Sequence, residues 1–192
     1  MNPQPEKIIK IVVIGPESTG KSTLCAALAD HFHTIWCKEY AREYLLEHGT
    51  NYSYEDLLTI AKGQLQLENE ATAAISSGAS KTPVLIIDTD MYVMKVWCEF
   101  VFGKCHQFIL DEIVTRKYDG YLLCKPDLPW TKDELREYPD LETREKLYHH
   151  YRDLLIHQNT PWFEVEGTGQ TRVQSAIDWI EKLIEAKQVS GA

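Results

Sequence analysis

The sequence predicts a three-layer α/β fold built on a five-stranded parallel sheet. Apolar, β-branched runs of strand length alternate along the chain with longer segments of helical periodicity. Several of these runs are apolar throughout, which is typical of strands buried on both faces of a parallel sheet. A glycine-rich loop joins the first apolar run to the first helical segment, as in a strand–loop–helix unit.

The expected elements follow this alternation from one end of the chain to the other. Strands are expected at residues 8–14, 33–38, 84–87, 121–124 and 162–166. Helices are expected at residues 23–29, 39–48, 54–77, 91–102, 107–116, 140–158 and from residue 173 onward. Ser53 and Asp56 mark the start of the longest helix, because a serine followed three residues later by an acidic side chain forms a capping box.

Composition and charge limit the classes of function. The chain has 192 residues, enough for one sizeable core, and we expect a single domain over residues 1–192. The net charge of −9 argues against a nucleic-acid partner, since no basic excess is available to neutralise phosphates. No apolar run approaches the length of a membrane span, and residues 1–7 lack the apolar segment of a signal peptide. We therefore expect a cytoplasmic protein without membrane insertion; its oligomeric state is not predicted.

Cysteine and histidine give no sign of a disulfide or a metal centre. The five cysteines are odd in number and form no C-x-x-C pair, so we expect reduced and mostly buried thiols. His149, His150 and His157 lack cysteine or carboxylate partners at ligand spacing, and we expect them on a solvated helix face.

The glycine-rich loop has the spacing of a phosphate-binding Walker A motif. It runs Gly15-Pro16-Glu17-Ser18-Thr19-Gly20-Lys21-Ser22. Its glycines permit backbone conformations in which N–H groups converge on a phosphate, beside a helix N-terminus. The lysine of such a loop reaches the β- and γ-phosphates, and the hydroxyl that follows binds magnesium. The alternative is an ordinary glycine-rich turn, which the strand–helix context disfavours. We expect ATP and Mg²⁺ as cofactors, with ATP at Gly15, Glu17, Ser18, Thr19, Gly20, Lys21, Ser22 and Thr23.

Acidic side chains follow two of the expected strands, at the sheet edge where ligands of parallel α/β proteins bind. Asp88 is assigned to magnesium together with Ser22; its alternative role is to cap a helix. Glu39 closes the second strand, where a carboxylate can take a proton from a substrate hydroxyl. Asp90 is the alternative base, or it caps the following helix. Arg42 lies three residues after Glu39 and either binds the substrate or pairs with Glu39.

Residues 125–140 are expected to form a lid, because two prolines exclude regular structure at its start. Phosphoryl transfer requires cations on the developing charge and the exclusion of water. Arg136 is the candidate for contact with ATP and for catalysis, and Arg144 is a weaker one. The alternative is a surface loop whose arginines form solvated ion pairs. The turn after the last strand ends at the same edge, so Gly167 and Thr168 are assigned to the ATP site.

Four segments together resemble a known enzyme family. They are the loop at 15–22, Glu39-Tyr40-Ala41-Arg42-Glu43, Asp88-Thr89-Asp90 and residues 133–136. In order and spacing they are similar to the ribosylnicotinamide kinase domain of NadR-type proteins, over nearly the whole chain. The resemblance implies a P-loop fold like that of nucleoside and nucleotide monophosphate kinases. It also implies ATP- and magnesium-dependent phosphorylation of the 5′-hydroxyl of nicotinamide riboside to nicotinamide mononucleotide, a step of NAD biosynthesis.

The acceptor site is expected on the helices at residues 40–78 and the end of the second strand. Some family members carry an aromatic residue directly before the Glu-Tyr pair, where this chain has Lys38; Trp36 points to the same side of the strand and is the candidate for stacking on nicotinamide. Gly63, inside the long helix, marks either the approach of a ligand or simple helix packing. The substrate contacts are assigned to Trp36, Lys38, Glu39, Tyr40, Arg42, Gln64 and Asp90.

Three functions are compatible with these features. The first is a small-molecule kinase, acting on nicotinamide riboside or another nucleoside. The second is a regulatory module that hydrolyses ATP slowly, and the third is a structural or partner-binding P-loop domain. A lid with arginine and a carboxylate on the acceptor side favour the kinase. Only 14 residues precede Gly15, so we expect a stand-alone kinase without the adenylyltransferase or helix-turn-helix domain of multidomain relatives.

Overall fold

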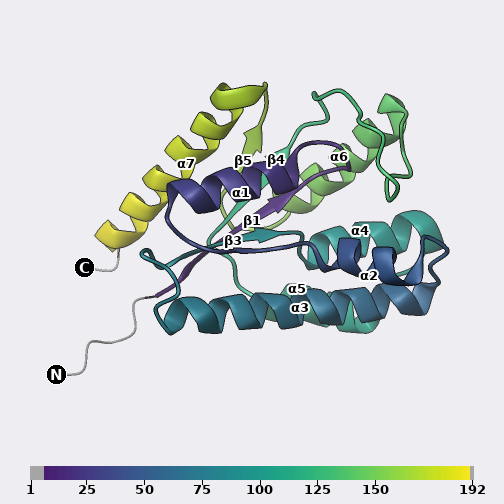
Figure 1. Ribbon diagram of the computed structural model, residues 1–192, viewed down its shortest axis with the longest axis horizontal. Helices are drawn as coiled ribbons and strands as arrows, with labels where there is room; N and C mark the ends of the chain where they lie inside the picture. Colours follow the sequence, from purple (N-terminus) through teal and green to yellow (C-terminus); the bar gives the residue numbers. More distant parts are fainter. Residues whose placement is uncertain (1–6, 191–192) are drawn as a thin grey trace.

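The structure is a computed structural model that describes residues 7–190, and within that range the elements follow the expected order (Figure 1). The strands are β1 (Ile9–Ile14), β2 (Trp36–Cys37), β3 (Val84–Asp88), β4 (Gly120–Cys124) and β5 (Trp162–Val165). The helices are α1 (Lys21–His31), α2 (Tyr40–His48), α3 (Tyr54–Ser76), α4 (Met91–Phe102), α5 (Gln107–Thr115), α6 (Leu141–Ile156) and α7 (Gly169–Ser190). The expectation about a signal peptide concerns residues 1–7, of which 1–6 lie outside the described residues.

The five strands form one parallel sheet in the order β2-β3-β1-β4-β5. β1 lies at its centre, where Ile11 pairs with Ile86 of β3 on one side and with Gly120 of β4 on the other. β3 and β4 are buried along their whole length, as their uninterrupted apolar runs predicted. The predicted α/β fold with a five-stranded parallel sheet is confirmed, and the carboxyl ends of all strands lie at one edge.

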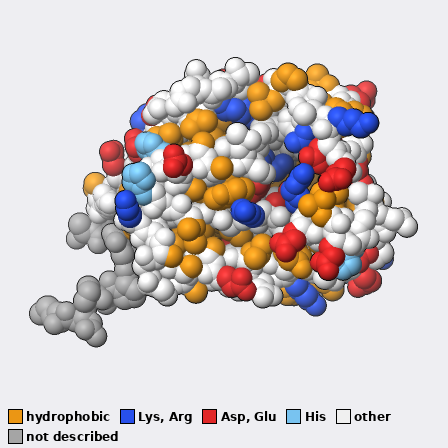
Figure 2. All heavy atoms as spheres, in the orientation of Figure 1, with side chains coloured by type: hydrophobic (Ala, Val, Ile, Leu, Met, Phe, Trp, Pro, Cys, Tyr) orange, Lys and Arg blue, Asp and Glu red, His pale blue; other side chains and the backbone are white. Residues whose placement is uncertain are grey.

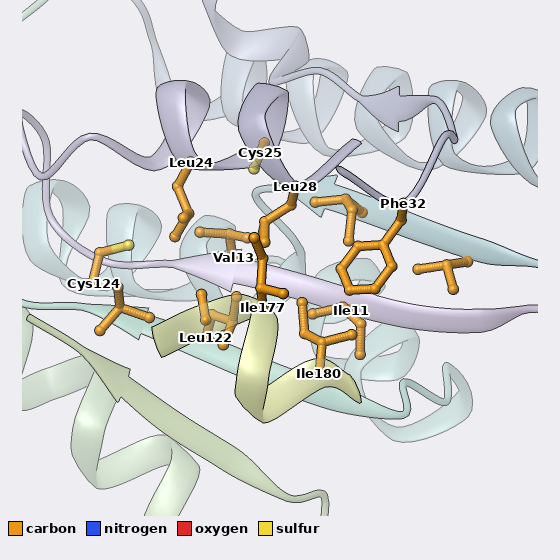
Figure 3. Packing of buried hydrophobic residues seen from close by; sticks show 14 of the residues in the cluster. Ile11, Val13, Leu24, Cys25, Leu28, Phe32, Leu122, Cys124, Ile177 and Ile180 are labelled. Atoms are coloured by element: carbon orange, nitrogen blue, oxygen red, sulfur yellow. The ribbon is translucent and has the colours of Figure 1, made fainter. Parts of the chain in front are cut away.

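Alternate side chains of β1 enter two different helical layers. α1 and α7 cover one face of the sheet, and α3, α4 and α6 cover the other (Figure 1). Ile11 and Val13 point to the first face, where they pack with Leu24 of α1 and with Ile177 and Ile180 of α7 (Figure 3). Val12 and Ile14 point to the second face, into a cluster that α3, α4 and α6 share. These two clusters make the sheet a rigid support for the loops at its edge.

A third apolar cluster holds α2, α3, α4 and α5 together beside the sheet. Its fully buried members include Leu57 and Ile60 of α3, Met94 of α4 and Ile109 of α5. Since α2 follows β2 and α4 follows β3, this lobe stands next to the carboxyl ends of both strands.

The second strand is shorter than the sequence predicts, because residues 33–35 close α1 instead of joining the sheet. His33 has a φ of 50°, in the left-handed region, and the N–H of Thr34 donates to the carbonyl of Ala29 at 2.9 Å. This left-handed turn at the helix C-terminus uses residues that the sequence assigned to the strand. Only Trp36 and Cys37 pair with β3.

The other general expectations can be compared directly with the structure. All five cysteines are free and four of them are buried, as expected. Among residues 7–190, no group of three or more histidine, cysteine, aspartate or glutamate side chains could hold a metal ion. No helix in this range is long and apolar enough to cross a membrane.

Gly63 lies where α2 packs on α3. A Cβ atom at this position would stand 2.2 Å from Cε1 of Tyr40, far inside van der Waals contact. The Tyr40 ring therefore occupies the space that a side chain at residue 63 would need. This contact favours the packing role for Gly63 over the approach of a ligand.

We expect Gly63→Ala to lower the free energy of unfolding by about 1–3 kcal/mol, because the ring of Tyr40 must move. Helix propensity alone would favour alanine by about 1 kcal/mol. Urea unfolding of both forms measures the difference. In a Tyr40→Ala background the same substitution should become neutral or stabilising; an equal cost in both backgrounds would show that the ring is not the cause.

Candidate active site

The Walker A loop connects β1 to α1 in a conformation that requires glycine. Gly15 has a φ of 142°, and a Cβ there would lie 2.7 Å from the carbonyl oxygen of Cys124 in β4. Gly20 and Ser18 have φ values of 75° and 56°, so the backbone turns sharply before α1 begins at Lys21. No side chain caps the N-terminus of α1. The loop and this helix end thus present backbone N–H groups where an anion can bind.

Two side chains of the loop fold back onto its own backbone. Lys21 Nζ donates to the carbonyl of Pro16 at 2.9 Å, and Thr19 Oγ1 donates to the same carbonyl at 2.8 Å. The ammonium group therefore rests across the loop, within reach of any anion that the loop holds.

Asp88 and Ser22 form the contact between the loop and β3. Ser22 Oγ donates to Asp88 Oδ2 at 2.6 Å. Asp88 Oδ1 is buried and has no hydrogen-bond partner among the described residues. Burial raises the pKa of Asp88 and the charge of Glu39 raises it further, whereas Lys21 lowers it. A buried carboxylate oxygen without a partner, next to a hydroxyl, fits a hard cation such as Mg²⁺.

Thr89 and Asp90 continue the chain from β3 into α4. Asp90 caps α4: its Oδ1 accepts from the N–H groups of Tyr92 and Val93, and its Oδ2 accepts from Tyr121 Oη at 3.0 Å. Burial raises the pKa of Asp90 to about 7. Of the roles considered for Asp90, this geometry matches the helix cap.

Thr89 has a φ of 78°, which is strained for a β-branched residue. The bend turns its hydroxyl toward the acceptor side, where Thr89 Oγ1 donates to Glu39 Oε1 at 3.4 Å. Glu39 is half-buried at the N-terminus of α2, so its carboxylate stands between the ends of β2 and β3. Arg42 does not pair with Glu39; it makes two hydrogen bonds, of 3.3 and 3.0 Å, to the Asp133 carboxylate.

Residues 125–140 contain no helix or strand and lie against the Walker A loop, as a lid would. Glu17 Oε1 accepts from Trp130 Nε1 at 3.2 Å and from the N–H of Tyr138 at 2.7 Å, while its Oε2 accepts from the N–H of Glu137 at 2.9 Å. Ser18 Oγ accepts from the N–H of Thr131 at 3.0 Å. The segment is therefore held to the loop by loop side chains.

The two lid arginines have different surroundings. Arg136 is half-buried and donates to the carbonyl of Thr131 within the lid. Arg144 lies on α6, where it is buried and donates to the carbonyl of Leu128 at 3.3 Å. The expected solvated ion pair is not what holds Arg144.

One cavity of about 240 Å³ joins these parts. It is lined by residues 15–23, by α2 and the loop after it, by α4, by residues 135–138 and by α6. In the view of Figure 2, acidic and basic side chains intermingle in the right half of the face, over α2 and the lid. Most of the expected ATP residues line the cavity, and so do Glu39, Arg42 and Arg136.

An aromatic wall, formed by Tyr52, Trp97, Phe100 and Tyr138, also lines the cavity. Trp97 Nε1 donates to Tyr52 Oη at 2.9 Å, and Tyr52 Oη donates to Glu137 Oε2 at 2.9 Å. The Tyr52 and Trp97 rings meet edge to face at 5.0 Å. A flat ring can therefore lie against fixed aromatic side chains.

Several expected substrate contacts lie outside the cavity lining. Trp36 packs with the cluster under α1 and α7, and exposed Lys38 stands 5.9 Å from its ring. Gln64 is buried: its amide accepts from the N–H of Tyr40 and donates to the carbonyls of Lys38 and Asp88. The same amide also lies 3.4 Å from a cysteine sulfur. The sequence places α3 in the acceptor site, but in the structure α3 packs against α2 and does not line the cavity.

Gly167 and Thr168 lie in an exposed turn beyond β5, and neither lines the cavity. The N–H of Gly167 donates to Asp127 Oδ2 at 2.7 Å, so the turn is fastened to the start of the lid.

The aromatic wall and Thr89 are site features that the sequence reasoning missed. Trp97 and Phe100 belong to a helix whose apolar residues have ordinary core spacing, so nothing local separates a cavity wall from a core contact. The Asp88-Thr89-Asp90 segment was recognised, but a positive φ at threonine has no sequence signal. Arg172, whose buried guanidinium contacts the loop, was also missed.

Comparison with known proteins agrees with this geometry. The trifunctional NAD biosynthesis/regulator protein NadR of Escherichia coli (strain K12) is 29% identical over 160 residues, which cover 81% of this chain and 38% of the relative. This chain thus spans less than half the length of that relative.

Among solved structures, NadR protein in complex with NR superposes with a TM-score of 0.75 at 20% identity, over 92% of this chain and 49% of that one. A complex of NadR protein with NAD and AMP-PNP gives a TM-score of 0.71 at 20% identity, with the same coverage. Thymidylate kinase from Ehrlichia chaffeensis gives 0.61 at 13% identity, over 91% and 100% of the two chains. These likenesses establish the fold.

A family model described as an AAA domain matches residues 10–172, which include the Walker A loop, the lid and every strand of the sheet except the first residue of β1. The chain belongs to this AAA domain family.

Proposed function

We propose that this chain transfers the γ-phosphoryl group of ATP to the 5′-hydroxyl of nicotinamide riboside, giving nicotinamide mononucleotide. One observation carries the proposal: a single cavity is lined by the Walker A loop, by the four side chains of the aromatic wall and by Glu39. A slow regulatory ATPase needs no such aromatic wall. The E. coli relative named for NAD biosynthesis and the NadR complex with NR support this acceptor.

ATP is the proposed donor, and a NadR complex with AMP-PNP supports that choice. Backbone N–H groups of residues 15–22 bind its phosphates, and Lys21 moves from the Pro16 carbonyl to the β- and γ-oxygens. Arg136, in the lid, contributes a second positive charge to the cavity. The lid excludes water, which would otherwise accept the phosphoryl group.

Ser22 and Asp88 are the residues that would hold Mg²⁺, through the hydroxyl and the unpartnered carboxylate oxygen. A bound ion neutralises charge on the phosphates during transfer. A site with one carboxylate and one hydroxyl suits Mg²⁺, because this ion keeps several waters and takes other ligands from the phosphates.

Glu39 is the proposed group that orients the acceptor hydroxyl and takes its proton. Its carboxylate accepts a hydrogen bond from Thr89, which fixes its orientation. Asp90 is less suited to this role, because both of its oxygens already accept hydrogen bonds in the cap of α4 and on Tyr121.

The aromatic wall is the proposed site for the acceptor ring. The nicotinamide ring of the riboside carries a positive charge, and a cation over an aromatic face gains about 0.5–2 kcal/mol. Glu137, hydrogen-bonded to Tyr52, adds a negative charge at this wall. A neutral nucleoside lacks this electrostatic term.

The direct test is an acceptor screen that measures ADP release with nicotinamide riboside, thymidine, deoxyadenosine and other nucleosides. We expect turnover with nicotinamide riboside, and Lys21→Ala should lower kcat by at least about a hundredfold while the thermal unfolding curve is unchanged. Faster turnover with a neutral nucleoside would show that this nucleoside, and not nicotinamide riboside, is the acceptor. Normal turnover in folded Lys21→Ala would contradict the assignment of the ATP site.

Two substitutions separate the acidic roles. Glu39→Gln should lower kcat by about 10²–10⁴ if it acts as a general base, with little change in the magnesium requirement. Asp88→Asn should raise the magnesium concentration that gives half-maximal rate. Magnesium titrations of both variants measure this difference. A raised magnesium requirement in Glu39→Gln but not in Asp88→Asn would show that the two roles are exchanged.

Substitutions of two tryptophans distinguish two candidate sites for the acceptor ring. Trp36 is the site expected from the sequence, and Trp97 is the site that the cavity lining suggests. We expect Trp97→Leu to raise the acceptor KM about tenfold, with the KM for ATP within twofold, because a ring contact is lost. Trp36→Leu is the matched control and should affect stability more than either KM. If Trp36→Leu raises the acceptor KM and Trp97→Leu does not, the ring stacks on Trp36.

A further inference from the structure

Arg172 connects the last helix to the Walker A loop. It lies in the first turn of α7, and its side chain is 5% exposed. Arg172 Nη2 donates to the carbonyl of Thr19 at 3.0 Å, which joins two residues 153 positions apart in the sequence. This contact takes no part in the helical core that α7 forms with α1 and the sheet.

The Thr19 carbonyl belongs to the peptide whose N–H is that of Gly20. In a trans peptide the N–H points opposite to the C=O. A guanidinium that binds the Thr19 oxygen from the α7 side therefore turns the Gly20 N–H away from α7. Thr19 and Gly20 both line the cavity, and Gly20 caps the N-terminus of α1. A donor on the oxygen also polarises the peptide and strengthens its N–H as a hydrogen-bond donor.

The same guanidinium holds two further segments. Arg172 Nη1 donates to Asp127 Oδ1 at 2.8 Å and to the carbonyl of Gly167 at 3.0 Å, and Nη2 also reaches the carbonyl of Lys125 at 3.4 Å. Asp127 Oδ2 in turn accepts from the N–H of Gly167 at 2.7 Å. The pair Arg172–Asp127 thus joins the loop, the start of the lid and the turn after β5.

Stability alone is a poor reason for this arrangement. Burying a guanidinium costs several kcal/mol, and well-packed apolar residues often replace a buried ion pair without loss. Arg172 Nε is buried and has no hydrogen-bond partner among the described residues, so the group is not fully satisfied. Its contacts are instead directed at three segments that surround the phosphate loop.

We propose that Arg172 is a positioning residue for ATP, which acts by fixing the Thr19–Gly20 peptide and, with Asp127, the adjoining lid and turn. The inference rests on the proposed function because it takes ATP as the ligand of the loop. It does not depend on the identity of the acceptor.

The test measures ATP binding by calorimetry, together with the KM values for ATP and acceptor and the thermal unfolding curve. Arg172→Gln should weaken ATP binding at least tenfold while the acceptor KM stays within twofold. Arg172→Lys should restore only part of the affinity, because an ammonium keeps the charge but cannot span the same four oxygens. Arg152→Gln is the matched control: it removes the pair between Arg152, exposed on α6, and Glu164 of β5, and ATP affinity should not change.

Asp127→Asn provides a second route if Arg172→Gln does not fold, because Asp127 is one-third exposed and lies in a loop. It should weaken ATP binding about three- to tenfold. ATP affinity within twofold of the original in folded Arg172→Gln or Asp127→Asn would overturn the proposal, as would full recovery in Arg172→Lys. Equal losses for ATP and acceptor would also overturn it. ATP binding is measured without an acceptor. A failed acceptor screen would therefore reject the proposed acceptor without changing the outcome of this test.

Discussion

The site depends on one hydrogen bond, from Ser22 in the first turn of α1 to Asp88 at the end of β3. It forms because β3 is the direct neighbour of β1, so the strand that leads into the loop and the strand that ends in the carboxylate lie side by side. The contact ties the first turn of α1 to the sheet edge, while the apolar cluster holds the rest of the helix on the sheet. It also leaves one buried carboxylate oxygen of Asp88 without a partner, next to the phosphate cradle.

The lid is held in a different way. Residues 125–140 have no helix or strand of their own. Their position depends on hydrogen bonds to Glu17 and Ser18 and on the ion pairs Arg42–Asp133 and Arg172–Asp127. Leu135 and Tyr138 also pack against apolar clusters. A hydrogen bond of this kind contributes about 1 kcal/mol to stability, much less than the core beneath it.

Local features of the sequence predicted most of the fold and the Walker A loop, whose residues line the cavity. The Walker A spacing, the apolar strands and the capping box at Ser53 each depend on a few adjacent residues, and the structure contains all three. The acceptor side depends on which helices meet, and that is decided by long-range packing. The sequence favours Trp36 as the ring contact, yet Trp36 packs partly buried against the cluster under α1, whereas Trp97 lines the cavity. Arg172 has no local signal, since its partners Thr19, Lys125 and Asp127 are distant in the sequence.

The short β2 has a consequence for the free edge of the sheet. Strand edges with exposed N–H and C=O groups can pair with other chains and begin aggregation. At this edge the left-handed turn at His33 keeps the residues just before Trp36 out of the strand, and α2 starts three residues after Cys37. Two paired residues offer too few backbone groups to template another strand. The same turn that ends α1 therefore also protects the molecule against edge-to-edge association.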